Sequence, residues 1–129
     1  MTAITTIFLI ALGGSIGAVL RYFCMSGFGA LFPSINGVYA TASVNIIGSL
    51  LMGALIGLLA KYGGQYSSEI RLFVAVGVLG SFTTFSTFSL DVISMYQNGQ
   101  LASAMIYVIS SVILSILALF AGLLLIRTL

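Results

Sequence analysis

The side chains of this chain that could do chemistry are mainly hydroxyls, and they are densest in GSFTTFSTFS, from Gly80 to Ser89. Six hydroxyl side chains and three phenylalanines share this stretch. In lipid, polar groups are unfavourable unless they find partners, so they mark either helix packing or a polar pathway. A phenyl ring has a negative face and a positive edge. Ring edges beside hydroxyl donors would therefore suit a small anion better than a cation.

Two further groups of polar residues recur at every fourth position. The first group is Thr41, Asn45 and Ser49, and Gly53 and Gly57 continue its spacing. The second has Ser110 beside it and consists of Ser103, Tyr107, Ser111 and Ser115. This spacing keeps side chains on one helix face. Hydrogen bonds between helices, or back to the same helix, would explain each stripe. A polar track is the alternative, and Asn45 favours it because its amide is both donor and acceptor.

The glycines and threonines of the opening stretch indicate a local break in a helix. Gly77 and Gly80 precede the adjacent Thr83 and Thr84, and Gly, Ser and Thr in series favour such breaks in membrane helices. A break frees backbone carbonyls, which are tolerated at membrane depth only when they are buried in protein or bind an ion. The stretch thus predicts a break from Gly80 to Thr84, whose carbonyls would suit a cation, and a helix face from Phe85 to Ser89 that would suit an anion.

Side chains suited to catalysis are nearly absent. The chain has no His, one Cys and two acidic residues, so it offers no internal acid–base pair and no cysteine cluster. We therefore predict that the protein is not an enzyme. The net charge of +2 is too small to suggest nucleic-acid binding.

The elements that must position these residues are membrane helices. Hydrophobic residues make up 60% of the 129 residues and charged residues 5%, too little charge to cover a soluble domain. Long segments carry no charged side chain: 1–20, 22–60, 72–90 and 92–126. A spanning helix needs about 20 apolar residues. We predict an all-α, multi-pass membrane protein with one domain over residues 1–129, whose third span is broken in its middle. The spans are expected at about 5–25, 39–60, 70–96 and 101–126.

Connections are predicted at the Gly- and Pro-containing segment 27–37, at KYGGQYSSE (61–69) and at QNGQ (97–100). Four spans place both termini on the same side. Lys61, Arg71 and Arg127 lie on that side and only Arg21 on the other. The positive-inside preference is therefore weak, which would permit insertion in both orientations.

Two GxxxG pairs predict close approach of helices. They are formed by Gly13 with Gly17 and by Gly53 with Gly57, and small residues at this spacing let membrane helices touch through their backbones. The pairs could pack helices within one subunit or between subunits. One subunit is a thin bundle, so we expect an oligomer.

Three motifs together resemble the Fluc/CrcB-type fluoride channels of bacteria. They are GGSIGAVLRY (13–22), SVNIIGSLLMG (43–53) and GSFTTFSTFS (80–89), and the resemblance covers essentially the whole chain. It implies a fluoride-selective channel in the bacterial inner (cytoplasmic) membrane that lets cytoplasmic fluoride leave passively and confers fluoride resistance. It also implies a dual-topology homodimer, with two antiparallel subunits in the lipid bilayer and two pores lined by both.

The resemblance also implies roles for individual residues. Those lining the fluoride pore would be Asn45, Phe85, Ser86, Thr87, Phe88, Tyr107, Ser111 and Ser115. Arg21 and Thr41 would lie toward a vestibule. A structural Na⁺ at the dimer centre would be held by the backbone carbonyls of Gly80 and Thr83 from both subunits. Phe82 is expected to serve packing instead.

Two other functions fit some of these features. A small dual-topology multidrug or cation exporter has a similar size and four spans, but its proton coupling usually needs a carboxylate in the first span. Residues 1–20 contain none. An assembly or anchor protein would use the GxxxG pairs for packing, but it would not account for the two polar stripes and the threonine-rich break.

Overall fold

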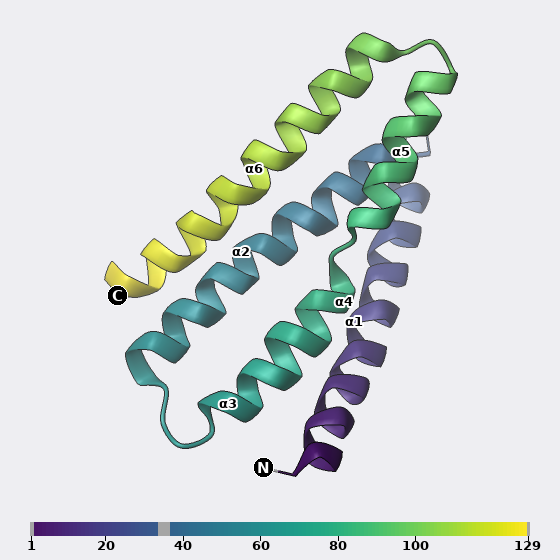
Figure 1. Cartoon of the computed structure of the whole chain (residues 1–129). Helices are drawn as coiled ribbons and strands as arrows, with labels where there is room; N and C mark the ends of the chain where they lie inside the picture. The colour runs from purple at the N-terminus through teal and green to yellow at the C-terminus, as the bar shows by residue number, and fades with distance from the viewer. Residues whose placement is uncertain (1, 34–36, 129) are drawn as a thin grey trace.

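The computed structural model of the protein describes residues 2–33 and 37–128, and all regular structure in these ranges is helical. Figure 1 shows the elements in chain order. The helical stretch between α3 and α4 is π-helical and is called η1. The bounds of the elements are α1 (Ala3–Leu31), α2 (Val38–Tyr62), α3 (Ser67–Ile70), η1 (Arg71–Leu79), α4 (Gly80–Phe82), α5 (Phe85–Gln97) and α6 (Leu101–Thr128).

Four helical segments are long and apolar enough to cross a membrane, namely Ala3–Leu31, Val38–Tyr62, Ser67–Gln97 and Leu101–Thr128. The prediction of an all-helical chain with four spans is therefore confirmed. The first helix is longer than expected. It continues to Leu31, so Gly27 and Gly29 are helical and not part of a loop, because a helix need not end where the roughly 20 residues that cross the lipid end. Residues 34–36 of the predicted loop lie outside the described residues.

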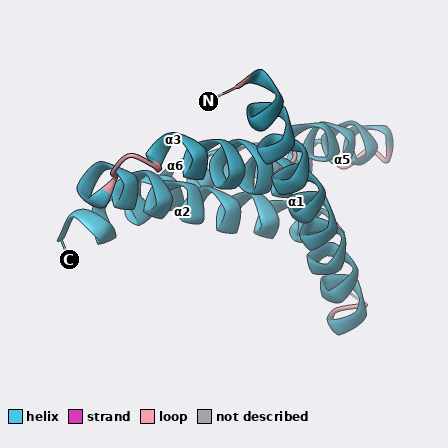
Figure 2. Cartoon of the chain, turned by 90° about the horizontal axis from the view of Figure 1, so that it is seen from below, coloured by secondary structure: helices cyan, strands magenta, loops and turns pink. Residues whose placement is uncertain are grey.

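The helices associate in two pairs that are distant in sequence. Helix α2 lies along α6, and α1 lies along η1 and α4. Figure 1 shows both termini and the α2–α3 connection at one end of the bundle, with the α5–α6 turn at the other. Seen from below in Figure 2, α1 crosses the α2–α6 layer at a steep angle, and α5 extends beyond α1 on the far side. The turn contains Gly99 at φ 75°, a backbone conformation that glycine adopts readily.

Helices α2 and α6 touch through their backbones. A Cβ added at Gly53 would collide with the Leu119 carbonyl, and one added at Gly122 would collide with the Leu50 carbonyl. Neither helix has room there for a side chain larger than hydrogen, so van der Waals contact can act between backbones. We call this contact the α2–α6 seam.

The first GxxxG pair forms an equivalent contact between α1 and η1. A Cβ at Gly13 would meet the Phe73 carbonyl and, at 3.0 Å, the Gly77 Cα, while Gly17 lies against the Val78 backbone. The π-helical turns of η1 end where the Gly80 N–H donates to the Ala75 and Gly77 carbonyls. Both GxxxG pairs therefore pack helices within one subunit.

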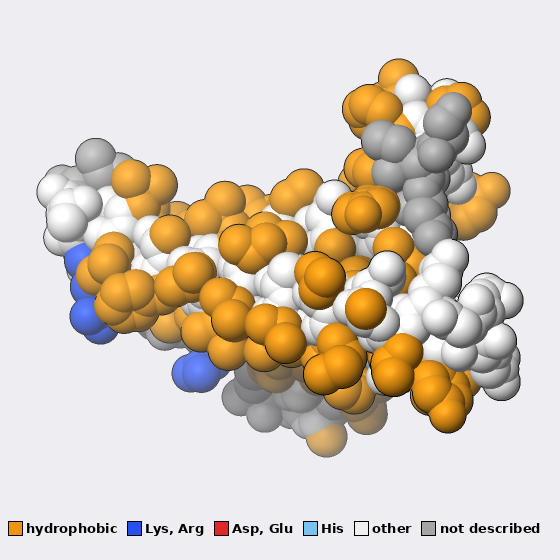
Figure 3. Space-filling model, turned by 90° about the horizontal axis from the view of Figure 1, so that it is seen from above, with side chains coloured by type: hydrophobic (Ala, Val, Ile, Leu, Met, Phe, Trp, Pro, Cys, Tyr) orange, Lys and Arg blue, Asp and Glu red, His pale blue; other side chains and the backbone are white. Residues whose placement is uncertain are grey.

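The surface of the subunit is mostly apolar. Large hydrophobic side chains are exposed on all the long helices, among them Phe8, Phe23, Ile47, Leu90 and Ile106. Figure 3 shows hydrophobic side chains over most of the face in view, with the Lys and Arg side chains gathered toward one end. Such a surface is suited to lipid or to another apolar protein surface.

Candidate functional site

A cavity of about 320 Å³ lies where α2, α5 and α6 meet the connection between α4 and α5. Its lining residues are Asn45, Ser49, Thr83, Thr84, Phe85, Phe88, Ser111, Val112, Ser115 and Ile116. Five of the eight predicted pore residues therefore line one cavity, and they come from three different helices. The lining combines two phenyl rings and two aliphatic side chains with hydroxyl groups and one amide.

Two residues with extended backbone separate α4 from α5. Thr83 has φ −78° and ψ 159°, and Thr84 has φ −150° and ψ 119°. Gly80 is helical, so the non-helical segment is shorter and later than the expected Gly80 to Thr84. β-Branched threonines favour extended backbone more than helix. We call Thr83 and Thr84 the interruption.

Asn45 pairs with the backbone of Thr84 on both sides of its amide. The Thr84 N–H donates to Asn45 Oδ1 at 2.8 Å, and Asn45 Nδ2 donates to the Thr84 carbonyl at 3.0 Å. An asparagine side chain can satisfy both groups because its amide has the same donor and acceptor as a peptide bond. Helix α2 thereby supplies the hydrogen bonds that the helical ladder loses at this residue.

Arg21 contacts the other residue of the interruption. Its guanidinium Nη1 donates to the Thr83 carbonyl at 3.2 Å, and the Thr83 N–H still donates to the Leu79 carbonyl at 3.1 Å. All four backbone polar groups of Thr83 and Thr84 therefore have partners. Two of the three residues that supply them lie on other helices, Arg21 on α1 and Asn45 on α2.

The Thr84 hydroxyl caps the N-terminus of α5. Its oxygen accepts a hydrogen bond from the Thr87 N–H at 3.1 Å, its O–H donates to Thr87 Oγ1 at 3.0 Å, and it lies 3.3 Å from the Ser86 hydroxyl. A threonine is a favoured N-cap because its oxygen satisfies an N–H of the first turn. The hydroxyls of Ser86 and Thr87, both predicted to lie by the pore, are thus grouped around the cap.

The two predicted pore phenylalanines have opposite exposure. Phe85 is 77% exposed and Phe88 is 8% exposed, although their ring centroids are only 5.6 Å apart. Phe88 is held on its other side by Tyr107, at 5.3 Å between centroids. Phe82, expected to serve packing, is buried next to Gly48. Phe88 is therefore fixed inside the subunit, while Phe85 projects from its surface.

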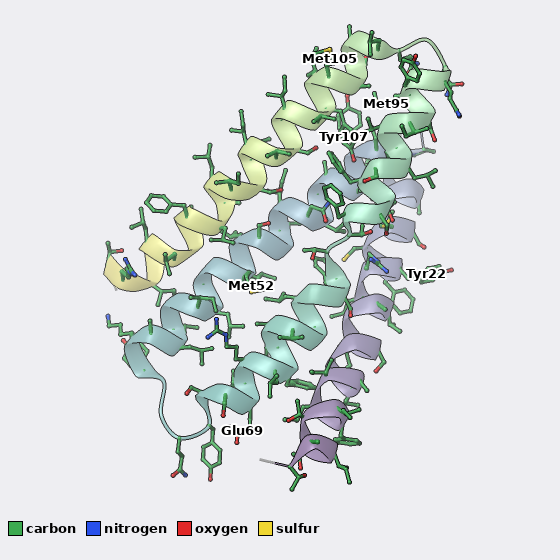
Figure 4. All side chains as sticks on the ribbon, viewed as in Figure 1. Tyr22, Met52, Glu69, Met95, Met105 and Tyr107 are labelled. Atoms are coloured by element: carbon green, nitrogen blue, oxygen red, sulfur yellow. The ribbon has the colours of Figure 1, made fainter. Side chains whose placement is uncertain are left out.

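Tyr107 points from α6 toward α5, as Figure 4 shows. Its hydroxyl donates to Asp91 Oδ2 at 3.2 Å. It borders a second cavity of about 420 Å³ together with Ser103, Ser110 and Ser111. Ser111 lines both cavities, so the hydroxyl stripe of α6 passes from one to the other.

Two buried hydroxyls have no hydrogen-bond partner within the part of the chain that the structure describes, Thr41 Oγ1 and Ser111 Oγ. A buried polar group without a partner is unfavourable and calls for an explanation such as a bound ion or water. For Ser111 the two cavities offer room for such a partner.

Several polar residues of the site were not among the predicted pore residues. Ser49 and Thr84 line the first cavity, and Asp91 holds the Tyr107 hydroxyl. Ser49 could have been found from its place one turn after Asn45 in the α2 stripe. Asp91 lies one turn after Phe88 on α5, a spacing that keeps the two on neighbouring parts of one face.

One protein family and several named proteins are similar to this chain over most of its length. The family model described as "CrcB-like protein, Camphor Resistance (CrcB)" matches residues 8–123. A protein of Rhodopseudomonas palustris is 46% identical over 126 residues, which are 95% of this chain and 97% of that protein. A protein of Erythrobacter litoralis is 49% identical over 122 residues, 92% of this chain and 89% of that protein. A third, from Agrobacterium fabrum, is 46% identical over 94% of this chain and 95% of its own length.

Each of these three relatives bears the name "Fluoride-specific ion channel FluC". The family model covers nearly the whole chain, and the relatives match along nearly their full length. The chain belongs to the CrcB-like protein family.

Proposed function

We propose that the protein is a fluoride-selective ion channel, a multi-pass protein of the bacterial inner membrane through which cytoplasmic fluoride leaves passively. The observation that carries this function is the cavity that joins polar groups of α2 and α6 to the phenyl rings of α5. Its residues occur in a chain that is similar from end to end to proteins named fluoride-specific ion channels. Export down the electrochemical gradient would confer resistance to fluoride.

The cavity offers an anion hydrogen-bond donors without a full charge. The Ser111 hydroxyl has no hydrogen-bond partner among residues 2–33 and 37–128, and Asn45 Nδ2 carries a second hydrogen besides the one given to Thr84. The Ser115 hydroxyl and the edges of the two rings complete the set. Conduction requires binding that replaces hydration yet releases the ion, and neutral donors meet both requirements better than a salt bridge does.

A second subunit would complete this site. Phe85 is 77% exposed although it lines the cavity, so one wall of the cavity lies at the subunit surface. We propose that the partner is an antiparallel copy of the same chain, which the weak charge asymmetry permits. Ser86 and Thr87 on the same turn of α5 would then lie by the path between subunits, and Thr41 would lie toward the vestibule.

The interruption would also break the third membrane span, and its carbonyls fit a structural Na⁺. The Thr84 N–H, which in a continuous helix would donate to the Gly80 carbonyl, donates to Asn45 instead. The Thr83 carbonyl accepts one hydrogen bond and keeps a second lone pair. Unwound backbone carbonyls are known ligands of Na⁺ in membrane proteins. Gly80 and Thr83 of both subunits would hold the ion, which would supply a positive charge at the dimer centre when bound.

Fluoride efflux from liposomes tests the proposal. Purified protein is placed in fluoride-loaded vesicles with Na⁺ and valinomycin, and efflux is followed with a fluoride electrode. We expect fast efflux from the native protein and at least about a tenfold loss in Phe85→Ile and Phe88→Ile, since each removes a ring edge. The dimer should stay intact in size-exclusion chromatography.

Phe8→Ile is the matched control, because Phe8 is an exposed ring on α1 away from the cavity. It should leave efflux unchanged. Efflux of the native protein no faster than from protein-free vesicles would exclude a fluoride channel, and a drug exporter would then have to be tested. Unchanged efflux in both ring variants would remove the rings from the mechanism.

A further inference from the structure

Arg21 places a permanent positive charge beside the interruption. It lies within the first candidate span, is partly buried, and donates to the Thr83 carbonyl at 3.2 Å across 62 positions of sequence. The neighbouring Tyr22 points away from the bundle in Figure 4 and is well exposed. The guanidinium brings a full positive charge to this contact.

The two carboxylates of the chain are engaged elsewhere. The only acidic residues are Glu69 and Asp91. Glu69 bonds to the Ser68 hydroxyl, and Asp91 accepts from Tyr107. The contact of Arg21 with the interruption is thus made to a neutral carbonyl dipole, which satisfies the hydrogen bond but leaves the charge in place.

Satisfying the Thr83 carbonyl does not in itself require a charge. Asn45 satisfies both backbone groups of Thr84 with a neutral amide, one residue further along the same segment. The distinguishing property of Arg21 is therefore its charge at the oxygen proposed to bind Na⁺.

We propose that Arg21 sets the affinity of the interruption for cations by competing with Na⁺ for the Thr83 carbonyl. This inference rests on the cation site of the proposed function. The guanidinium takes one lone pair of the oxygen, and a cation on the other lone pair experiences a like charge nearby. Like charges about 5 Å apart at an effective dielectric constant of about 20 correspond to an affinity change on the order of a hundredfold. Because Arg21 is only partly buried, solvent screening reduces the expected effect to about tenfold.

The consequence is a cation site of moderate affinity. Without the competing charge, carbonyls from two subunits would hold Na⁺ more tightly and release it more slowly. With Arg21 present, the interruption keeps a bonded geometry whether or not a cation is bound, because its hydrogen bond remains available to Thr83.

The test measures Na⁺ binding through protein stability. Full-length protein in detergent is melted over a series of Na⁺ concentrations, with N-methylglucamine keeping the ionic strength constant. In Arg21→Gln, which removes the charge and keeps an N–H donor, the half-saturating Na⁺ concentration should fall about tenfold or more. Arg21→Lys keeps the charge and is the matched control, so it should stay within about threefold of the native value. An unchanged or higher value in Arg21→Gln would overturn the inference.

A chemical variant covers the case in which Arg21→Gln does not fold. Cys24 is the single cysteine and is exposed. A synthetic thioester of residues 1–23 with citrulline at position 21 can therefore be joined to a fragment 24–129 that begins with Cys24. The Cys24 thiol displaces the thiol leaving group, and the acyl group then moves to the Cys24 amine to give the full chain. Citrulline has nearly the shape of arginine and no charge, and it should lower the half-saturating Na⁺ concentration in the same way. A ligated protein with the native value would overturn the inference.

Fluoride efflux from the same preparations separates this inference from the proposed function. If the native protein shows efflux but neither it nor any variant melts in a Na⁺-dependent way, the role of Arg21 is overturned and the channel stays in place. Na⁺-dependent melting that shifts in Arg21→Gln, without efflux, would support the role of Arg21 and exclude the channel.

Discussion

The α2–α6 seam and the interruption bring helices together in opposite ways. In the seam, Gly53 and Gly122 leave the backbones of two helices in direct contact. At the interruption, the side chains of Asn45 and Arg21 reach across to the backbone of Thr83 and Thr84. The seam relies on van der Waals contact, whereas the interruption relies on hydrogen bonds to groups that have left the helical ladder.

Helix α2 takes part in both regions, with the same spacing of four. Asn45 and Ser49 line the cavity, and Gly53, one turn later, touches α6. The polar stripe of α2 therefore ends where the backbones of α2 and α6 come into contact. The α2 residues that line the two cavities lie between Val38 and Ser49, and the seam begins at Leu50, whose carbonyl meets Gly122.

The largest effect is expected in the seam. Gly53→Ala places a Cβ against the Leu119 carbonyl, so the two helices must move apart along their whole contact. Overpacking of this kind costs about 1–3 kcal/mol or more, and backbone atoms cannot move aside as a side chain can. We expect a large loss of monodisperse protein in size-exclusion chromatography and a much lower melting temperature.

Gly27→Ala is the control for this change. A Cβ at Gly27 meets nothing within 4 Å, and alanine favours a helix more than glycine by roughly 1 kcal/mol. Its yield should equal or exceed the native one. If Gly53→Ala also behaved like the native protein, the backbone contact in the seam would not be essential for stability.

An intermediate effect is expected at the interruption. Asn45→Asp keeps an oxygen for the Thr84 N–H but turns a second oxygen toward the Thr84 carbonyl, in place of the donor that bonds to it at 3.0 Å. Leaving a buried group unsatisfied costs about 1–3 kcal/mol, and the negative charge repels an anion in the cavity. Fluoride efflux should fall at least about tenfold, with a clear but smaller loss in melting temperature than for Gly53→Ala.

Ser15→Ala is the control for the loss of a polar group, because the Ser15 hydroxyl donates to the Leu12 carbonyl of its own helix. It should change neither efflux nor melting temperature. Native efflux by Asn45→Asp would show that the pairing with Thr84 does not shape the path.

The smallest effect on stability is expected for Ser111→Ala. The Ser111 hydroxyl has no hydrogen-bond partner in the described structure, so its removal should change the unfolding free energy by about 0.5 kcal/mol or less. Efflux should nevertheless fall severalfold, because the hydroxyl faces both cavities. A melting curve and an efflux trace of the same preparation separate the two effects.

Ser110→Ala provides the comparison on the next residue, where the hydroxyl donates to the Tyr107 carbonyl. It should leave efflux closer to the native rate than Ser111→Ala does. The reverse order would mean that the path follows the other side of α6.

The periodic features of the molecule could be predicted from the sequence, and the contacts that depend on a partner helix could not. The four spans follow from charge-free lengths, and spacing of four placed Asn45 with Ser49 and Ser111 with Ser115. The pattern also indicated a change of backbone near Thr83. It did not identify which helix each glycine touches, because GxxxG describes one surface and not the surface opposite.

Other details of the structure could not be predicted from the sequence either. The pairing of Asn45 with Thr84 and the contact of Arg21 with Thr83 connect positions 39 and 62 residues apart, so no local pattern reports them. The opposite exposure of Phe85 and Phe88 depends on Tyr107, which fixes one ring and not the other. The π-helical hydrogen bonding of η1 has no residue signature of the kind that marks a turn.

The pairing of α2 with α6 also bears on how the protein is made. Helix α2 leaves the ribosome before α6, yet its glycine surface at Gly53 and Gly57 is covered by α6. Membrane helices insert first and associate afterwards, so α2 must wait in the bilayer with that surface facing lipid. The α2–α6 seam can therefore close only after α6 has been made, and a chain that stalls before α6 would present an uncovered glycine surface to the machinery of membrane quality control.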